Sequence, residues 1–437
     1  MTTVSDQTAI PYPSTHLITS SLKSWIVCFT GALFYFYEFI QMNMFNAISK
    51  PLILEFKLSA TTLGYLSSSY FYATVIFLFP AATILDRFST RKVVLCALSV
   101  CVLGTFMFSQ AQTLFVLTVS RFLTGIGSAF CFLSCVRLAS RWFPPYRLAL
   151  VIGLMVTFAM LGGFIAQTPL TLLINHLNWR QTLLIDAAIG LGIIVLIFTL
   201  VHDYPAQLSK LQQQQRKQLQ SIGYWRSLRL ALSKPYNWLC GIYSCLVNLP
   251  IFLLGGIWGI LYLQQVHQLT KTSASYATSM LFIGTMLGAP FVGWLSDYLG
   301  KRQFLMIVGA ISALIIVLCL MQIPHLSQLT LLTLFFLLGF ATSTQVISYP
   351  LVAENNPPVI TATAVSVISI SILSGGIIFE PLFGWLLDQH WSGITQGGVR
   401  TYSAADFQFA MWLFPVVFAI ALIAALVVPK IIRRQKI

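Results

Sequence analysis

Three charged residues stand out inside long apolar stretches of this 437-residue sequence, where a charge is most costly. They are Glu38, Arg121 and Glu380, within the apolar runs 22–48, 114–138 and 359–386. A charged side chain in a hydrocarbon interior costs roughly 2.5–3.5 kcal/mol on insertion scales and usually marks a functional position. Carboxylates and a guanidinium can exchange protons or bind a charged solute, so these residues are the first candidates for chemistry.

Glu38 and Arg121 are predicted to lie at similar depths. If both runs are helices, each residue lies about 10 to 15 Å from the same end, at 1.5 Å per residue. A carboxyl beside a guanidinium stays ionised, whereas the same carboxyl buried without a partner holds its proton. Switching between these situations would couple a conformational change to proton movement. The alternative is a fixed ion pair that joins two helices.

Glu380 has two possible roles. Pro381 follows it directly, so the local backbone is unusual. It can act with Glu38 and Arg121 in proton coupling, or it can be a structural or gating residue near the outer surface.

The composition requires a lipid environment around these residues. Hydrophobic residues make up 57% of the chain and charged residues only 8%, far below the roughly one quarter of a soluble domain. A membrane-spanning helix needs about 20 apolar residues, and about twelve such runs occur. They lie near 22–48, 60–84, 93–110, 114–138, 148–172, 181–202, 239–265, 274–296, 303–322, 330–350, 359–386 and 407–429. Runs of this length favour helices over barrel strands, which alternate over about ten residues.

The net charge of +14 does not indicate nucleic-acid binding, because the basic residues segregate. With both termini in the cytoplasm, only Lys50, Lys57, Arg180, Lys271 and Arg400 fall on the outer side. This bias is typical of an inserted multi-pass protein, and the basic face would contact anionic lipids. We therefore expect a plasma membrane protein (the inner membrane if bacterial). The first twenty residues do not read as a removable signal peptide.

A polar interval divides the chain into two similar halves. We predict a first six-helix bundle at 1–203, a cytoplasmic linker at 204–238 and a second bundle at 239–437. Phe122-Leu-Thr-Gly125 matches Phe336-Leu-Leu-Gly339, and Gly162-Gly163 matches Gly375-Gly376, at offsets of about 213 to 214 residues. The eight cysteines fall in or beside apolar runs, so we expect no disulfide, metal site or cofactor.

A charged loop motif occurs once in each half. The first copy contains Asp86-Arg87 and Arg91, and the second contains Asp297 between Gly293 and Gly300, followed by Lys301-Arg302. This motif resembles the loop signature of major facilitator superfamily transporters, and Arg121-Phe-Leu-Thr-Gly125-Ile-Gly127 is similar to the family's fourth-helix motif. The resemblance implies twelve transmembrane helices in two pseudo-symmetric six-helix bundles, an all-α fold. It also implies a cytoplasmic gate formed by Asp86, Arg87, Arg91, Asp297, Lys301 and Arg302. The first copy departs from the pattern, with Ala82 and Ser89 at the glycine positions.

The same resemblance implies a central path lined by the first, fourth, seventh and tenth helices. The candidate solute-binding residues on these helices are Tyr35, Gln41, Arg121, Asn248, Trp258, Tyr262, Gln345 and Tyr349. Pro250 with Gly255-Gly256 can break the seventh helix and free carbonyls toward a wet interior.

We predict a secondary transporter that works by alternating access, with a monomer as the unit. The solute would be small and polar or carboxylate-bearing, such as an amino acid, a short peptide or an organic acid, carried by proton symport. Alternatives are a proton-driven exporter of amphipathic compounds and a transport-inactive sensor on the same fold. The sequence lacks a nucleotide-binding lysine loop and a nucleophile elbow, which argues against an ATP-driven pump and an enzyme.

Overall fold

The computed structural model describes residues 22–144, 147–204, 229–323, 326–356, 361–396 and 399–435. Twelve helices in these residues are long and apolar enough to cross a membrane. Each predicted run overlaps one of them, which confirms the all-α fold of two six-helix bundles. The largest boundary difference is in the seventh span, which ends at Ile257 where the prediction placed its end at 265, and the fourth and fifth spans continue to Trp142 and His176, about four residues beyond the predicted ends.

The helices of the amino-terminal half are α1 (Leu22–Asn43), α2 (Phe45–Phe56), α3 (Ala60–Arg87), α4 (Thr90–Gln110), α5 (Leu114–Ser128), α6 (Cys131–Trp142), α7 (Leu148–Ile165), α8 (Thr168–His176) and α9 (Trp179–Leu200). The carboxyl-terminal half contains α12 (Pro235–Pro250), η3 (Ile251–Ile257), α13 (Gly259–Val266), α14 (Lys271–Leu299), α15 (Arg302–Gln322), α16 (Gln328–Thr342), η4 (Ser343–Ile347), α17 (Ser348–Asn355), α18 (Thr361–Gln389), the strands β1 (Thr395–Gln396) and β2 (Val399–Arg400), α19 (Ala404–Met411) and α20 (Leu413–Gln435). The two strands form a small antiparallel hairpin.

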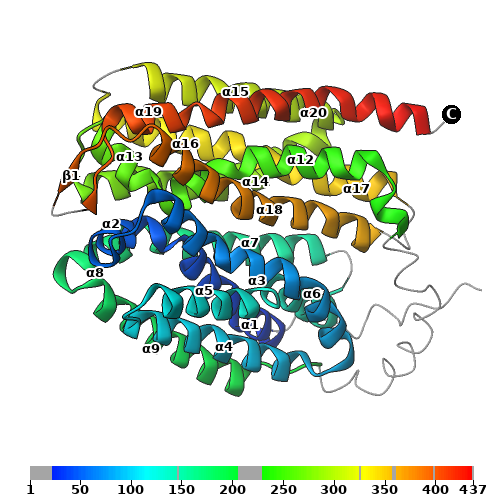
Figure 1. Cartoon of the computed structure of the whole chain (residues 1–437). Coiled ribbons are helices and arrows are strands. Elements are labelled where there is room, and N and C mark those ends of the chain that lie inside the picture. Colours follow the sequence, from blue (N-terminus) through cyan, green and yellow to red (C-terminus); the bar gives the residue numbers. More distant parts are fainter. Residues whose placement is uncertain are drawn as a thin grey trace, which may run out of the picture.

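The two halves lie side by side, the amino-terminal half below and the carboxyl-terminal half above in Figure 1. Across their boundary α3 packs along α18 and α7 packs along α14. These pairs are equivalent under the internal repeat, since α3 and α14 are the second spans of their halves and α7 and α18 the fifth. The boundary is therefore pseudo-symmetric.

The repeated glycines make this close packing possible. A Cβ on Gly163 would lie 2.5 Å from the ring of Phe282 on α14, and a Cβ on Gly376 would lie 2.6 Å from the ring of Phe71 on α3. Phe71 and Phe282 are themselves about 211 residues apart. Each half thus places one phenylalanine against a glycine of the other, so the repeat seen in the sequence is a repeat of the interface.

The helical segment that begins in the first span extends beyond the predicted run, which ends at residue 48. Its helix turns at Met44 and continues as α2 to Phe56, past the apolar run that Lys50 and Pro51 interrupt in the sequence. Lys57 ends α2 in a left-handed conformation with φ of 53°. This second segment brings Asn46 and Ser49 to the boundary between the halves.

The predicted break in the seventh helix is present. After Pro250 the chain forms a π-helical turn, η3, before α13 resumes the α-helix at Gly259. The freed carbonyls, however, accept hydrogen bonds from the amino-terminal half: Asn46 Nδ2 donates to Leu254 O at 2.9 Å and Ser49 Oγ donates to Ile257 O at 2.9 Å. A turn that loses its own backbone partners is thus stabilised by side chains of the other half.

A second set of hydrogen bonds joins the halves beside the strand hairpin. Asp388 Oδ2 accepts from the backbone N–H and the hydroxyl of Thr61 at 2.8 and 2.5 Å, and Tyr402 Oη accepts from Ala60 N at 2.8 Å. Both sets lie at the end of the bundle that carries α2, α8, α13 and β1, on the left in Figure 1. We call this the joined end.

Candidate functional site

Glu38 is buried in the amino-terminal half, at 4% exposure. Its Oε1 accepts hydrogen bonds from the hydroxyl of Tyr70 on α3 and from Ser128 Oγ at 2.9 Å, and Tyr70 Oη also contacts Ser128 Oγ at 2.7 Å. Its Oε2 has no hydrogen-bond partner in the part of the chain that the structure describes. Two hydroxyl donors therefore hold one oxygen, and the other is left for a proton or another group.

Arg121 has no solvent exposure. Its Nη1 donates to Gln41 O at 2.8 Å, and its guanidinium carbon lies 4.7 Å from the ring centroid of Phe45 and 4.8 Å from that of Tyr70. Nε and Nη2 lack hydrogen-bond partners among the described residues. A buried guanidinium with two unused nitrogens is costly, so these donors point to an anionic or polar ligand.

Arg121 and Glu38 do not form a direct ion pair in the described residues. Tyr70 lies between them, with its hydroxyl on the carboxylate and its ring beneath the guanidinium. The two residues predicted to lie at similar depths are thus connected through a third side chain, that of Tyr70, which sequence reasoning did not select.

Glu380 lies on α18 at 1% exposure, and its Oε2 has no hydrogen-bond partner in the described chain. It interacts electrostatically with Arg121 of the other half. The eleventh span is not peripheral, because α18 runs along α3 at the boundary of the halves. Arg121 thus lies between one acid of its own half and one of the opposite half.

Gln41 connects Arg121 to an acid that the sequence analysis did not single out. Its carbonyl accepts from Arg121, its amide nitrogen donates to Asp186 Oδ2, and its amide oxygen accepts from Thr105 Oγ1 at 2.9 Å. Asp186 is 4% exposed on α9. An acidic residue within the apolar run 181–202 was the signal that could have found it.

The remaining predicted solute-binding residues divide into two groups. Asn248 and Gln345 meet, with Gln345 Nε2 donating to Asn248 Oδ1 at 2.8 Å. Tyr35 lies within electrostatic range of both Glu38 and Tyr349.

Trp258 and Tyr262, the second group, have no exposure and pack elsewhere. The Trp258 ring stacks on Phe383 at 5.9 Å, and the Tyr262 hydroxyl donates to Leu320 O at 2.9 Å.

The Trp258 and Tyr262 side chains are therefore placed in the interior of the carboxyl-terminal half. The structure does not bring them to Arg121. Sequence reasoning assigned them to the path because they lie on the seventh span, but the π-turn η3 separates Trp258, which follows it directly, and Tyr262, which lies on α13, from α12.

The loop-motif residues lie at the opposite end from the joined end and contact their own halves. Arg302 donates to Asp297 Oδ1 at 3.1 Å and to Glu354 at 2.5 and 3.0 Å, and Lys301 is exposed beside it. In the first half Arg87 is exposed, and the backbone N–H of Arg91 donates to Asp203 Oδ1 at 2.9 Å. The side chain of Asp86 lies outside the described residues.

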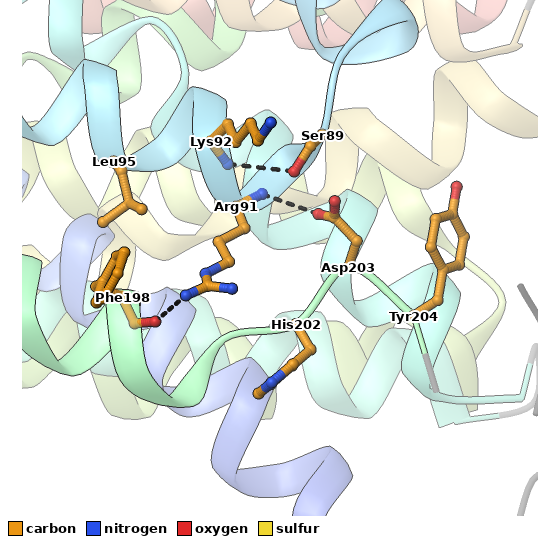
Figure 2. Close-up of a pocket in the computed structure, with 8 residues that line it drawn as sticks. All are labelled: Ser89, Arg91, Lys92, Leu95, Phe198, His202, Asp203 and Tyr204. Carbon is orange, nitrogen blue, oxygen red and sulfur yellow. Dashed lines mark hydrogen bonds between the residues drawn. The ribbon is translucent and has the colours of Figure 1, made fainter. Parts of the chain in front are cut away.

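A pocket of about 550 Å³ opens beside the first copy of this motif (Figure 2). It is lined by Ser89, Arg91, Lys92, Leu95, Phe198, His202, Asp203 and Tyr204. Figure 2 shows the Arg91 guanidinium extending to the carbonyl of Phe198 at the end of α9, while its backbone meets Asp203. Because Glu38, Arg121 and Glu380 do not line it, this pocket is separate from the buried charges.

Two pseudo-symmetric six-helix bundles with a buried arginine and acids near their boundary define a multi-pass membrane transporter rather than an enzyme. The chain belongs to the Major Facilitator Superfamily, whose model matches residues 31–270 and 240–436. The resemblance drawn from the loop motifs is thereby confirmed.

The relatives are named as transporters or as a membrane sensor protein. The chain is 25% identical over 292 residues to a probable sulfoacetate transporter of Cupriavidus necator, covering 62% of this chain and 64% of the relative. It is 24% identical over 390 residues to the membrane sensor protein UhpC of Escherichia coli, covering 83% and 85%. It is 26% identical over 257 residues to a hexuronate transporter of Bacillus subtilis, covering 59% and 60%.

Among solved structures, the chain is similar to a bacterial homologue of the human lysosomal transporter Spinster in an inward-facing, unoccupied conformation. The TM-score is 0.77 at 16% identity, with 95% of this chain and 99% of the other covered. This similarity supports the fold.

Proposed function

We propose that the protein is a secondary active transporter that takes up a small organic anion together with protons. The observation that carries the proposal is Arg121, a fully buried guanidinium whose Nε and Nη2 have no partner among the described residues. A planar fork of N–H donors fits the two oxygens of a carboxylate or sulfonate.

Proton coupling follows from the acids around this arginine. Glu38 and Glu380 both interact electrostatically with Arg121, and each has one oxygen without a partner in the described chain. One guanidinium cannot neutralise two carboxylates and a solute anion at once. A solute that takes the arginine would leave the acids to be neutralised by protons, so the anion and the proton would bind together.

The relatives support an anionic solute. A sulfoacetate transporter and a hexuronate transporter both act on small organic acids by their names. Asn248 and Gln345 can add hydrogen bonds to the polar remainder of such a molecule from the opposite half. The predicted range of amino acids, peptides and organic acids is thereby narrowed to organic acids in this proposal.

The joined end would face the outside. The basic loop motifs lie at the other end, where the positive-inside bias places the cytoplasm and both termini. Closure at the joined end and contacts of Arg302 and Arg91 within their own halves fit a state that opens inward, in which the loop-motif gate is released. Alternation would then exchange the two sets of contacts.

Transport assays on purified protein in liposomes test the proposal. Labelled sulfoacetate and glucuronate are the anionic probes and glucose is the neutral control, under an acid-outside or an acid-inside gradient. We expect one of the anions to accumulate with acid outside, and Arg121→Gln to abolish that accumulation. Accumulation of glucose but neither anion would contradict the proposal, and accumulation driven only by acid inside would indicate the exporter.

The similarity to UhpC favours a sensor as the second candidate, because that match covers the most of this chain among the three relatives above. A sensor binds its ligand without moving it. Ligand-induced thermal stabilisation with no uptake and no counterflow would favour the sensor, since a ligand that prefers the folded protein raises its melting temperature.

A further inference from the structure

We propose that Asp186 is a second proton-binding site of the amino-terminal half, linked to Arg121 through Gln41. The proposal deepens the proton coupling described above and rests on that proposed function for its stoichiometry, though its first test needs no solute. It adds a carboxyl from the sixth span to the site.

Asp186 faces the interior of its bundle. Its neighbours Ile185 and Ile189 are 40% and 49% exposed on the outer face of α9, whereas Asp186 is 4% exposed. One turn further, Gly190 gives room for Tyr37, since a Cβ on this glycine would lie 2.9 Å from the tyrosine ring. The helix therefore presents its acid and a glycine to α1 and α4.

The charge of Asp186 has little compensation. Among the described residues, Asp186 accepts a hydrogen bond from the neutral amide of Gln41. The titratable side chains that interact with it from the packed helices are Tyr37 on α1 and Cys101 on α4, and neither supplies a positive charge at neutral pH. An ionised carboxylate in such a place is expensive unless a cation joins it, and a proton is the smallest one that fits.

Gln41 provides the connection to the central arginine. One end of its amide contacts Asp186, the other contacts Thr105, which in turn accepts from the Tyr37 hydroxyl at 3.2 Å. Its backbone carbonyl accepts from Arg121 Nη1 at 2.8 Å. Loss or gain of a proton at Asp186 changes the hydrogen bond that its carboxyl makes with the Gln41 amide. Because the backbone carbonyl of Gln41 also positions the Arg121 guanidinium, the change can reach the arginine.

Infrared difference spectroscopy of the purified protein in lipid nanodiscs tests the site directly. Spectra recorded between about pH 4 and 9, the range in which perturbed carboxyls titrate, report the C=O stretch of protonated acids. We expect a band that decreases as the pH rises and that Asp186→Asn removes. The substitution keeps an oxygen acceptor for Gln41, so the fold should persist.

Asp406→Asn is the matched control. Asp406 is a fully buried acid of the other half, but it caps α19 and accepts from Ser403 N at 2.7 Å. Its removal should leave the titrating band unchanged. Identical spectra for wild type and Asp186→Asn, or an Asp186 band that does not change with pH, would overturn the proposal.

The second readout is the ratio of protons to anions, measured from reversal potentials with the organic anion found to be carried. Asp186→Asn should lower this ratio by one proton while uptake continues, whereas Glu38→Gln should abolish coupled uptake. An unchanged ratio would overturn the proposal. Should no anion be carried, a titrating Asp186 band would still support this inference while the proposed function fails.

Discussion

Asn46 Oδ1 accepts a hydrogen bond at 2.9 Å from the backbone N–H of Ile260, a residue 214 positions away in the other half. The Nδ2 group of the same side chain donates to Leu254 O and Gly255 O, within the π-turn itself. One asparagine thus supplies partners for backbone groups both within the break in the seventh span and just after it. These groups are satisfied in this way only while the halves are joined.

Asn46→Ala should loosen the joined end. The substitution removes several interhalf hydrogen bonds, each contributing about 0.5–1.5 kcal/mol, and leaves buried backbone groups unpaired. We expect amide hydrogen exchange across residues 251–262 to accelerate about tenfold or more. Mass spectrometry of peptides from this segment measures the change.

Asn175→Ala is the control for this effect. Asn175 makes an interhalf bond to Thr272 at 3.3 Å, but it is exposed, so water can replace the partner. Exchange in 251–262 should remain as in wild type. Equal protection of this segment in wild type and Asn46→Ala would show that the asparagine does not hold the π-turn.

Gly376→Ala should impair transport by forcing the halves apart. The added methyl would lie 2.6 Å from the Phe71 ring, closer than any tolerated contact, in packing that leaves little room for the ring to move. We expect initial uptake rates of the carried anion to fall about tenfold, with similar expression. Gly192→Ala adds a methyl where nothing lies within 4 Å and should be neutral. Equal uptake rates for Gly376→Ala and Gly192→Ala would contradict the close contact between Gly376 and Phe71 at the boundary of the halves.

Arg302→Ala should lower the melting temperature modestly. Arg302 bridges Asp297 and Glu354, but both acids are more than half exposed, so each pair contributes about 0.2–1 kcal/mol at most. The loss should shrink at high salt because exposed charges are screened. Lys301→Ala, at the exposed neighbouring position, should change the melting temperature less. A decrease in melting temperature that is the same at low and high salt would indicate that Arg302 stabilises the fold by packing and not by its charge.

Tyr402→Phe should weaken the second set of interhalf bonds, and the resulting loss of stability should be the same at every pH near neutrality. Burial, together with the hydrogen bond to Asp388, raises the pKa of the Tyr402 hydroxyl above its usual value. The protonated hydroxyl is therefore the form that stabilises the fold, and its contribution is present below about pH 10 and lost only as the pH rises further. The melting temperatures of wild type and variant should differ by a constant amount between about pH 6 and 9. A difference that disappears within that range would contradict this assignment.

The sequence predicted the spans well because lipid imposes a length and a composition on each of them. It also predicted the repeat, whose glycines the structure places at the interface against Phe71 and Phe282. It identified Glu38 and Arg121 because a charge in an apolar run is conspicuous. Glu380 was found in the same way, but its place at the boundary depends on how α18 packs, which no local pattern encodes.

What the sequence did not predict depends on contacts between distant segments. Tyr70 between Glu38 and Arg121, and Asn46 beside the π-turn, are ordinary polar residues whose roles arise from residues on other helices. Trp258 and Tyr262 were assigned to the path from their position in the chain, whereas the break at η3 directs them into packing. Helix breaks and their partners are decided by tertiary structure.

The most direct test of the account compares two modes of transport in the same liposomes for wild type and Glu38→Gln. One is accumulation of the labelled organic anion driven by an acid-outside gradient, and the other is counterflow, which needs no net proton movement. We expect Glu38→Gln to lose accumulation and keep counterflow, and Arg121→Gln to lose both. Gradient-driven accumulation by Glu38→Gln at the wild-type level would contradict it.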